Sequence, residues 1–271
     1  MSLRITTNVE AFNAYRNLNG IQNKISSSME KLSSGYRINR GADDAAGLGI
    51  SEAMRSQIRG LAQAQKNIQD GVSLVQTAEG NLGQVHSMLQ RVRELAVQYG
   101  NGAISTDGKN AIQTEVNQLA SEISRVMGQA KFNGISLLTG TEASVTFQVG
   151  ANDGETILVS MGEVGDVKLT TNNWADLSTD KDNMISRIDS AITAVSAKRS
   201  TLGAVQNRLE NAMQVQAAYQ ENVMAAESRI RDVDIANEMV SYTKNQILAQ
   251  AGTAMLSQAN QSPQQVLALL R

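Results

Sequence analysis

The chain has 271 residues, a formal net charge of −2 and no Cys. A disulfide framework and a thiolate metal site are therefore excluded, and the charge balance argues against a nucleic-acid-binding protein. Aromatic residues make up only 3% of the chain, as expected where helices pack closely through small side chains. No apolar run approaches the ~18 residues of a membrane span, and the opening residues lack the apolar run of a signal peptide.

The first predicted element is a helix over residues 3 to 34 with a broad, irregular apolar side. Such a helix is marginal alone, so it needs a partner. Residues 36 to 50 then form a glycine-rich connector. This connector lacks the preceding strand and the Lys-Ser/Thr ending of a phosphate-binding loop. We interpret its carboxylates, Asp43 and Asp44, as helix caps and as partners of Arg37 and Arg40, not as metal ligands.

Residues 57 to 99 predict a long helix whose small and apolar residues recur at alternating steps of three and four. One extra step of three separates Val75 from Ala78. This heptad seam predicts a partner helix along its full length. At 1.5 Å per residue the helix would be about 64 Å long, more than the width of a compact globule of this chain length, roughly 50 Å. The seam therefore predicts a rod. Its positions are Ile58, Leu61, Gln65, Ile68, Val72, Val75, Ala78, Leu82, Val85, Leu89, Val92, Ala96 and Tyr99.

A shorter helix and a small β region are predicted next. Ser105-Thr106-Asp107 offers an N-cap for a helix ending near residue 130, and Phe132-Asn133-Gly134 is a turn signal. Apolar and polar residues then alternate over 144 to 149 and again over 156 to 161, with a turn between them. This pattern predicts a β-hairpin. A looser segment, residues 162 to 179, carries the single Trp.

A second long helix is predicted from Asp180, with steps that match those of the first seam. We therefore expect the two long helices to lie against each other. A last helix should run from residue 235 to about 261, where Pro263 interrupts it, and it is apolar on several sides. The seam of the second long helix is Ile185, Ile188, Ile192, Val195, Leu202, Val205, Leu209, Ala212, Gln216, Tyr219, Val223, Ala226 and Ile230.

The order of these elements is nearly palindromic. It predicts a mainly α fold: an elongated antiparallel helical bundle or coiled coil formed by the N- and C-terminal halves, with a small β-hairpin insert. Both end helices keep apolar residues on sides that one partner helix would not cover. Such surplus surface is typical of a polymer subunit.

Catalysis is not expected. The single His, His86, lies beside the seam without a nucleophile or a second His, so we interpret it as a surface or groove residue. No catalytic, cofactor-binding or metal-binding residues are predicted.

Several multi-residue motifs in the same order resemble bacterial flagellin from end to end: residues 5–8, 32–39, 43–48, 89–98, 132–134 and 148–154. The resemblance implies a tail domain with its spoke, residues 1–45 with 231–271, and a rod domain, residues 46–230, whose β-hairpin region covers about 135–179. Many flagellins insert large outer domains after the hairpin, and here that space holds only residues 162 to 179.

By this resemblance the subunit is secreted unfolded through the flagellar type III export channel and polymerises into the extracellular filament used for swimming. The implied partners are other copies of itself, the hook–filament junction proteins, the filament cap and an export chaperone, with no nucleic acid and no membrane. In hosts, a flagellin-sensing Toll-like receptor is implied, contacting Gln90, Arg91, Leu95 and Glu115. The first three lie off the seam, so we expect them to face outward.

Two other structural classes stay open. A needle or needle-tip protein of a secretion system also uses coiled coils, and a hook–filament junction protein shares the terminal helices. The connector motif and the hairpin turn favour flagellin. The sequence leaves the organism, the protofilament number and handedness, the glycosylation sites and the major or minor status of the subunit open.

Overall fold

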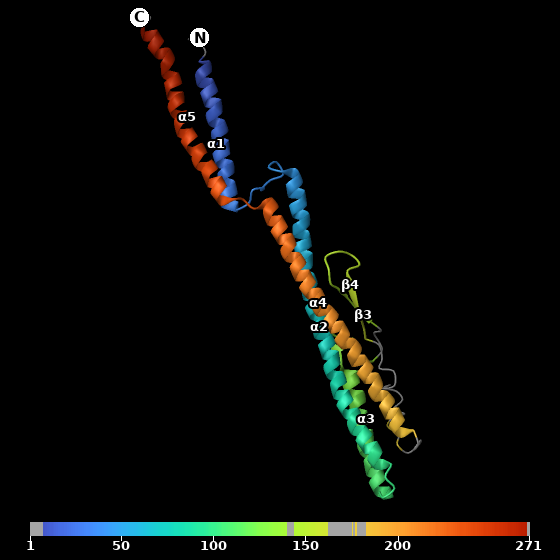
Figure 1. Cartoon of the computed structure of the whole chain (residues 1–271). Helices are drawn as coiled ribbons and strands as arrows, with labels where there is room; N and C mark the ends of the chain where they lie inside the picture. Colours follow the sequence, from blue (N-terminus) through green and yellow to red (C-terminus); the bar gives the residue numbers. More distant parts are fainter. Residues whose placement is uncertain (1–7, 140–143, 162–174, 176, 178–182, 270–271) are drawn as a thin grey trace. The chain divides into compact units, whose positions relative to one another are not determined.

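A computed structural model of the chain describes residues 8–139, 144–161, 175, 177 and 183–269 (Figure 1). Helices dominate, which confirms the predicted fold class. The chain divides into two compact units: Met1–Ser56 with Asn222–Arg271, and Gln57–Glu221. The elements are α1 (Val9–Ser34), α2 (Ala45–Tyr99), α3 (Thr106–Gln129), β1 (Lys131–Phe132), β2 (Ile135–Ser136), β3 (Ser144–Gln148), β4 (Thr156–Ser160), α4 (Met184–Arg231) and α5 (Ile235–Leu269).

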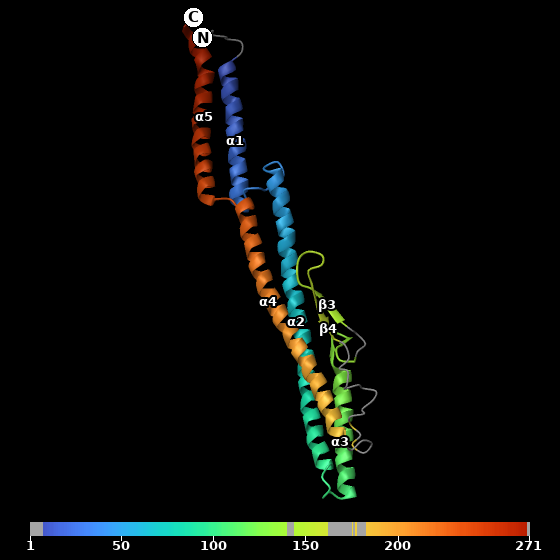
Figure 2. The same cartoon turned by 45° about the vertical axis from the view of Figure 1, so that its right-hand side comes forward.

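In the first unit, α1 and α5 lie side by side and antiparallel (Figures 1 and 2). Helix α1 begins at Val9, where Asn8 is its N-cap and accepts a hydrogen bond from the Ala11 N–H. The predicted start at residue 3 lies outside the described residues. It ends at Gly35, whose φ of 77° is a left-handed conformation that glycine adopts without steric cost. The pair shares one stripe of half-buried positions, with Gly252 opposite Leu18.

Helix α5 corrects one prediction. It was expected to end near residue 261 because of Pro263, but it continues to Leu269. A proline inside a helix removes one backbone donor and leaves the carbonyl four residues earlier without its helical partner. Here that carbonyl belongs to Ala259, and it accepts a hydrogen bond from the Asn8 side chain instead.

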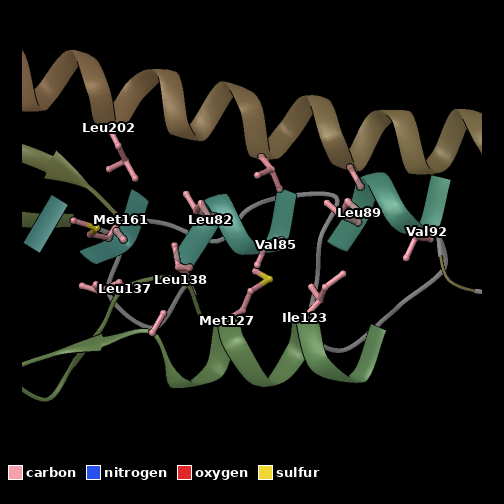
Figure 3. Close-up of a cluster of buried hydrophobic side chains, with 14 of the residues drawn as sticks. Leu82, Val85, Leu89, Val92, Ile123, Met127, Leu137, Leu138, Met161 and Leu202 are labelled. Atoms are coloured by element: carbon pink, nitrogen blue, oxygen red, sulfur yellow. The ribbon is translucent and has the colours of Figure 1, made fainter. Parts of the chain in front are cut away.

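In the second unit, Figure 3 shows α2 between α4 on one side and α3 on the other. The predicted seam of α2 is largely confirmed: Ile58, Gln65 and Val72 are half-buried and every other position is buried. Gln65 meets Gln220 of α4 through a side-chain hydrogen bond of 2.9 Å. At this level of α4 Gln220 faces α2 in place of Tyr219, so the prediction for Tyr219 is wrong and its side chain is 44% exposed.

The β region completes this core. Strands β3 and β4 pair antiparallel, with Val145 opposite Val159, which confirms the hairpin. The ring of Phe147 lies over Gly71 of α2, where an added Cβ would come within 3.3 Å of it. Among the residues that Figure 3 labels, the core includes Leu82, Val85, Leu89 and Val92 of α2, Ile123 and Met127 of α3, Leu202 of α4, and Leu137, Leu138 and Met161.

Several limits differ from the prediction or lie outside the described residues. Helix α2 begins at Ala45, twelve residues before the predicted start at 57, because the Asp44 carboxylate accepts from the Gly47 N–H and caps it. The predicted start of α4 at Asp180 and most of the segment 162–179, including Trp174, lie outside the described residues. The rod shape and the domain limits at 45/46 and 230/231 stay predictions.

Candidate functional site

Three of the four residues expected to contact a receptor form one exposed charged cluster on α2 and α3. The Arg91 guanidinium donates to the Glu115 carboxylate through Nε at 3.1 Å and Nη2 at 2.9 Å. Its Nη1 donates to Glu94 at 3.1 Å. Gln90 lies beside it, exposed, with its Nε2 atom 3.0 Å from His86 Nε2. The structure thus brings Gln90, Arg91 and Glu115 together across two helices.

The fourth residue lies in the core. Leu95 is 2% exposed, so the expectation that it faces outward is wrong. That expectation rested on a single seam and one partner helix. Helix α2 is covered by both α4 and α3, so a second side of it is buried (Figure 3). Leu95 therefore packs beneath the charged cluster and does not belong to its surface.

The electrostatics of the cluster hold Arg91 in place. The hydrogen bonds that Arg91 donates to Glu94 and then to Glu115 raise the pKa of Arg91 above its ordinary value, so the guanidinium stays charged at every physiological pH. The side chains of Arg91 and Glu115 are 52% and 46% exposed. Solvent screens such a pair, so its contribution to stability is small and its main effect is to orient the guanidinium.

The residues considered for catalysis and metal binding have structural partners. His86 is half-buried, with Nε2 facing Gln90 and Nδ1 buried without a hydrogen-bond partner. Asp44 caps α2, which confirms the capping interpretation for that residue. Asp43 instead accepts from the backbone N–H groups of Asn39 and Arg40 within the connector and caps no helix. Within the part of the chain that the structure describes, no group of three or more His, Cys, Asp or Glu is placed to hold a metal ion.

The predicted arginine partners are wrong. Arg40 forms its ion pair with Glu30 at 2.9 Å, and Arg37 donates through Nη2 to the Ile230 carbonyl. Both aspartates use their oxygens for backbone N–H groups, because the tight connector presents these donors at close range.

The two connectors of the first unit are joined by a short antiparallel contact. The Arg37 N–H donates to the Arg231 carbonyl at 2.7 Å, and the Val233 N–H donates to the Gly35 carbonyl at 3.0 Å. The Arg231 guanidinium stacks on the Tyr36 ring at 4.8 Å. It also donates to Glu52 at 2.8 Å. Sequence reasoning missed Arg231, which lies at the end of α4 directly before residues 232–234, the connector between α4 and α5.

Large apolar side chains are exposed on α1 and α5. Among the described residues of α1, Ser28 alone is buried. None of residues 235–261 of α5 is buried. The side chains left open on this helix pair are Val9, Phe12, Tyr15, Met29, Ile235, Met239, Val240, Ile247, Leu248 and Met255. Their exposed fractions range from 42% at Leu248 to 69% at Val240.

No helix among the described residues is long and apolar enough to cross a membrane. The exposed apolar surface of α1 and α5 is interrupted by polar residues along both helices. Its form therefore suits contacts with other protein helices.

Comparisons with known proteins agree over nearly the whole chain. Residues 5–143 match the model of the bacterial flagellin N-terminal helical region, and residues 185–270 match that of the C-terminal helical region. The chain is 52% identical over 270 residues to a flagellin of Halalkalibacterium halodurans, covering 98% of this chain and 99% of that protein. It is 45% identical over 304 residues to a flagellin of Bacillus subtilis, covering 99% and 100%.

A third relative is the flagellar filament 33 kDa core protein of Treponema phagedenis. It is 46% identical over 284 residues, covering 98% of this chain and 99% of that protein.

Proposed function

Because the chain belongs to the bacterial flagellin family and is a structural subunit of the flagellar filament, we propose that it polymerises through the exposed apolar sides of α1 and α5. The observation that carries this proposal is the large apolar surface that the helix pair leaves uncovered. Covering one such side chain contributes about 1.5–3 kcal/mol, so a few buried at each contact hold subunits together. The subunit is a structural protein and not an enzyme, and it acts through the packing of its helices against neighbouring subunits.

Polymerisation of the purified chain tests this proposal. Monomers mixed with short sheared filaments should add to them and form long, wide filaments in electron microscopy. Removing residues 235–271, which carry α5, should leave a chain that no longer adds. Growth without α5 would overturn the proposal. Short collars in place of long filaments would instead indicate a hook–filament junction protein, and thin tubes a secretion needle.

Export through the flagellar type III channel into the extracellular filament is the proposed route. Helices rich in local contacts form rapidly, which suits a chain that leaves the cell unfolded and folds at the filament tip. The junction proteins, the filament cap and an export chaperone bound to the C-terminal tail are proposed partners on the basis of family membership. Secretion that is lost in a strain lacking the flagellar export apparatus, and retained in one lacking the general secretory route, would support this route.

A host Toll-like receptor is a second proposed partner, recognising the surface of Gln90, Arg91 and Glu115 with Leu95 packed beneath it. The supporting observation is that Glu115 and Glu94 hold the Arg91 guanidinium in one exposed orientation. Ordered arginine side chains of this kind are enriched among residues that dominate protein interfaces. The same surface would be covered by neighbours in the filament.

The receptor proposal is tested with two arginines of one helix. Arg91→Ala should weaken receptor activation by at least about 2 kcal/mol, some thirtyfold. Arg93→Ala is the matched control, because Arg93 pairs with Asp189 of α4 at 2.6 Å and points away from the cluster. Cross-linked filaments should activate poorly until they are depolymerised. Equal potency of the two variants, or of filament and monomer per subunit, would contradict the proposal.

A further inference from the structure

Pro263 leaves one backbone carbonyl near the end of α5 without a hydrogen-bond donor from the helix. The helix runs through this proline to Leu269. Proline has no backbone N–H, so the helix cannot supply the usual donor to the carbonyl of Ala259, four residues earlier. A half-buried carbonyl without a donor is costly, so a partner from outside the helix is needed.

That partner comes from the other end of the sequence. The Asn8 Nδ2 atom donates to the Ala259 carbonyl at 2.7 Å, across 251 residues of chain. The same side chain accepts through Oδ1 from the Ala11 N–H at 3.0 Å. The Asn8 carbonyl accepts from the Phe12 N–H at 3.1 Å. One amide therefore caps α1 and supplies the donor that Pro263 withholds from α5.

This bond restricts how the two helices align. Both helices carry small and apolar residues at steps of three and four, so a slip of seven residues would preserve most of the apolar contacts. It would not bring Asn8 to the carbonyl that lacks a helical donor. At the opposite end of the pair, Val233 and Gly35 are joined through their backbones. The helix pair is thus fixed at both ends: by the Val233–Gly35 backbone bond where the two connectors meet, and by the Asn8 side chain at the other end.

We propose that Asn8 is a positioning residue for assembly: its bond to the Ala259 carbonyl, freed by Pro263, sets the alignment of α1 and α5 and hence the apolar side that the pair offers to neighbouring subunits. The inference rests on the proposed role of α1 and α5 in polymerisation. A misaligned pair would still be helical, but it would offer a different arrangement of exposed apolar side chains.

A double-mutant cycle in the full chain tests the coupling. Asn8→Ser keeps an N-cap oxygen, because Ser caps helices about as well as Asn, but its hydroxyl is too short to replace the amide donor. Pro263→Ala restores the backbone N–H that the Ala259 carbonyl lacks. Asn8→Ser alone should raise the critical concentration for polymerisation about fivefold, as expected for one lost hydrogen bond. In the Pro263→Ala background the same change should raise it less than about twofold.

Asn13→Ser is the matched control, since Asn13 lies on the same helix but its amide oxygen accepts only locally, from Arg16. It should give the same small effect in both backgrounds. Hydrogen exchange at the Ala11 and Phe12 amides provides a second measurement in both monomer and filament. If Asn8→Ser and Pro263→Ala are coupled in hydrogen exchange but neither changes polymerisation, the role of α1 and α5 in assembly is refuted, and with it the assembly role of Asn8. The alignment of the two helices by the Asn8–Ala259 bond would still be supported. Equal effects of Asn8→Ser on the critical concentration in both backgrounds would overturn the Asn8 proposal. Ala11 and Phe12 amides that are unprotected in both monomer and filament would also overturn it.

Discussion

The α1–α5 pair and the α2–α4 pair are both built from apolar residues at heptad steps, yet their cores differ. The seam of α2 is buried because α3 and the β3–β4 hairpin cover the sides that α4 leaves open. In the part of the chain that the structure describes, α1 has one buried residue and residues 235–261 of α5 have none. A heptad seam therefore specifies a partner helix, whereas the fully buried core of the second unit also has a third layer. The proposed polymerisation would supply such a layer to the first unit from neighbouring subunits.

The largest expected difference between the two pairs is in their local stability. In the monomer, amides of residues 82–96 in α2 should exchange with solvent at least about 10⁴-fold more slowly than in an unfolded chain, since they open only with the core. Amides of α1 and α5 should exchange within about tenfold of the unfolded rate and become protected in the filament. Hydrogen exchange read by mass spectrometry measures both. Equal protection of the two pairs in dilute monomer would remove the distinction.

The next largest effect is expected from a substitution in the core of the second unit. Leu82 is fully buried between α3 and α4 (Figure 3). Leu82→Ala should lower the free energy of unfolding by about 2–5 kcal/mol, because it removes packed methyl groups and leaves a cavity. His86→Gln, one helical turn away on a half-buried side, should cost under about 1 kcal/mol. Thermal unfolding of the monomer gives both values, and equal losses would mean that the core is not organised along this seam.

An exposed apolar residue of the first unit should behave in the opposite way. Val240 is 69% exposed on α5, and Ser has a helix propensity close to that of Val. Val240→Ser should leave monomer unfolding within about 0.5 kcal/mol of the parent. It should raise the critical concentration for polymerisation about tenfold, as loss of ~1.5 kcal/mol of buried apolar surface implies.

Val97→Ser is its counterpart in the second unit, where Val97 is 53% exposed on α2. It should change the critical concentration by less than about twofold. If Val97→Ser weakens polymerisation as much as Val240→Ser, exposed apolar surface is used equally in both units and the comparison fails.

The smallest expected effect concerns pH and the connectors of the first unit. The hydrogen bond from Arg231 holds the pKa of Glu52 below its ordinary value of 4.5. Backbone N–H groups of Arg40 and then Asn39 likewise lower the pKa of Asp43 below 3.8. Because both pKa values are depressed by folding, the stability these groups add is present above their ordinary pKa values. It is lost as the pH falls through the folded ones.

Protection of the Arg37 and Val233 amides, corrected for the intrinsic exchange rate, should therefore fall severalfold between pH 6 and pH 3. Glu52→Gln should flatten this dependence, since the amide oxygen still accepts from Arg231 but does not titrate. An unchanged profile in Glu52→Gln would assign the acid sensitivity to other carboxylates.

The seam of α2 could be predicted because heptad spacing places its residues on one side of a helix, whatever the partner is. The β3–β4 hairpin was equally accessible, since apolar residues alternate on both strands and Asn152-Asp153-Gly154 supplies the turn. The capping role of Asp44 also followed from local sequence, because its backbone donor lies three residues away.

Three of the errors share one cause, which is a contact from a distant part of the chain. Leu95 was placed outside because a single seam does not reveal that α3 covers a second side of α2. Tyr219 was placed in the seam because the Gln65–Gln220 bond that shifts the alignment joins residues 155 positions apart. Helix α5 was ended too early because the effect of Pro263 depends on Asn8.

The sequence by itself thus determined the helices, their order, their antiparallel pairing and the hairpin, because these follow from periodicities and turn residues that act over a few positions. It also determined the family, through motifs spread along the whole chain. Only the tertiary structure decided which sides of each helix are covered and which stay open. The covered sides depend on how many elements pack against each part of a helix. Periodicity along one helix indicates that a partner exists, but it does not give the number of partners.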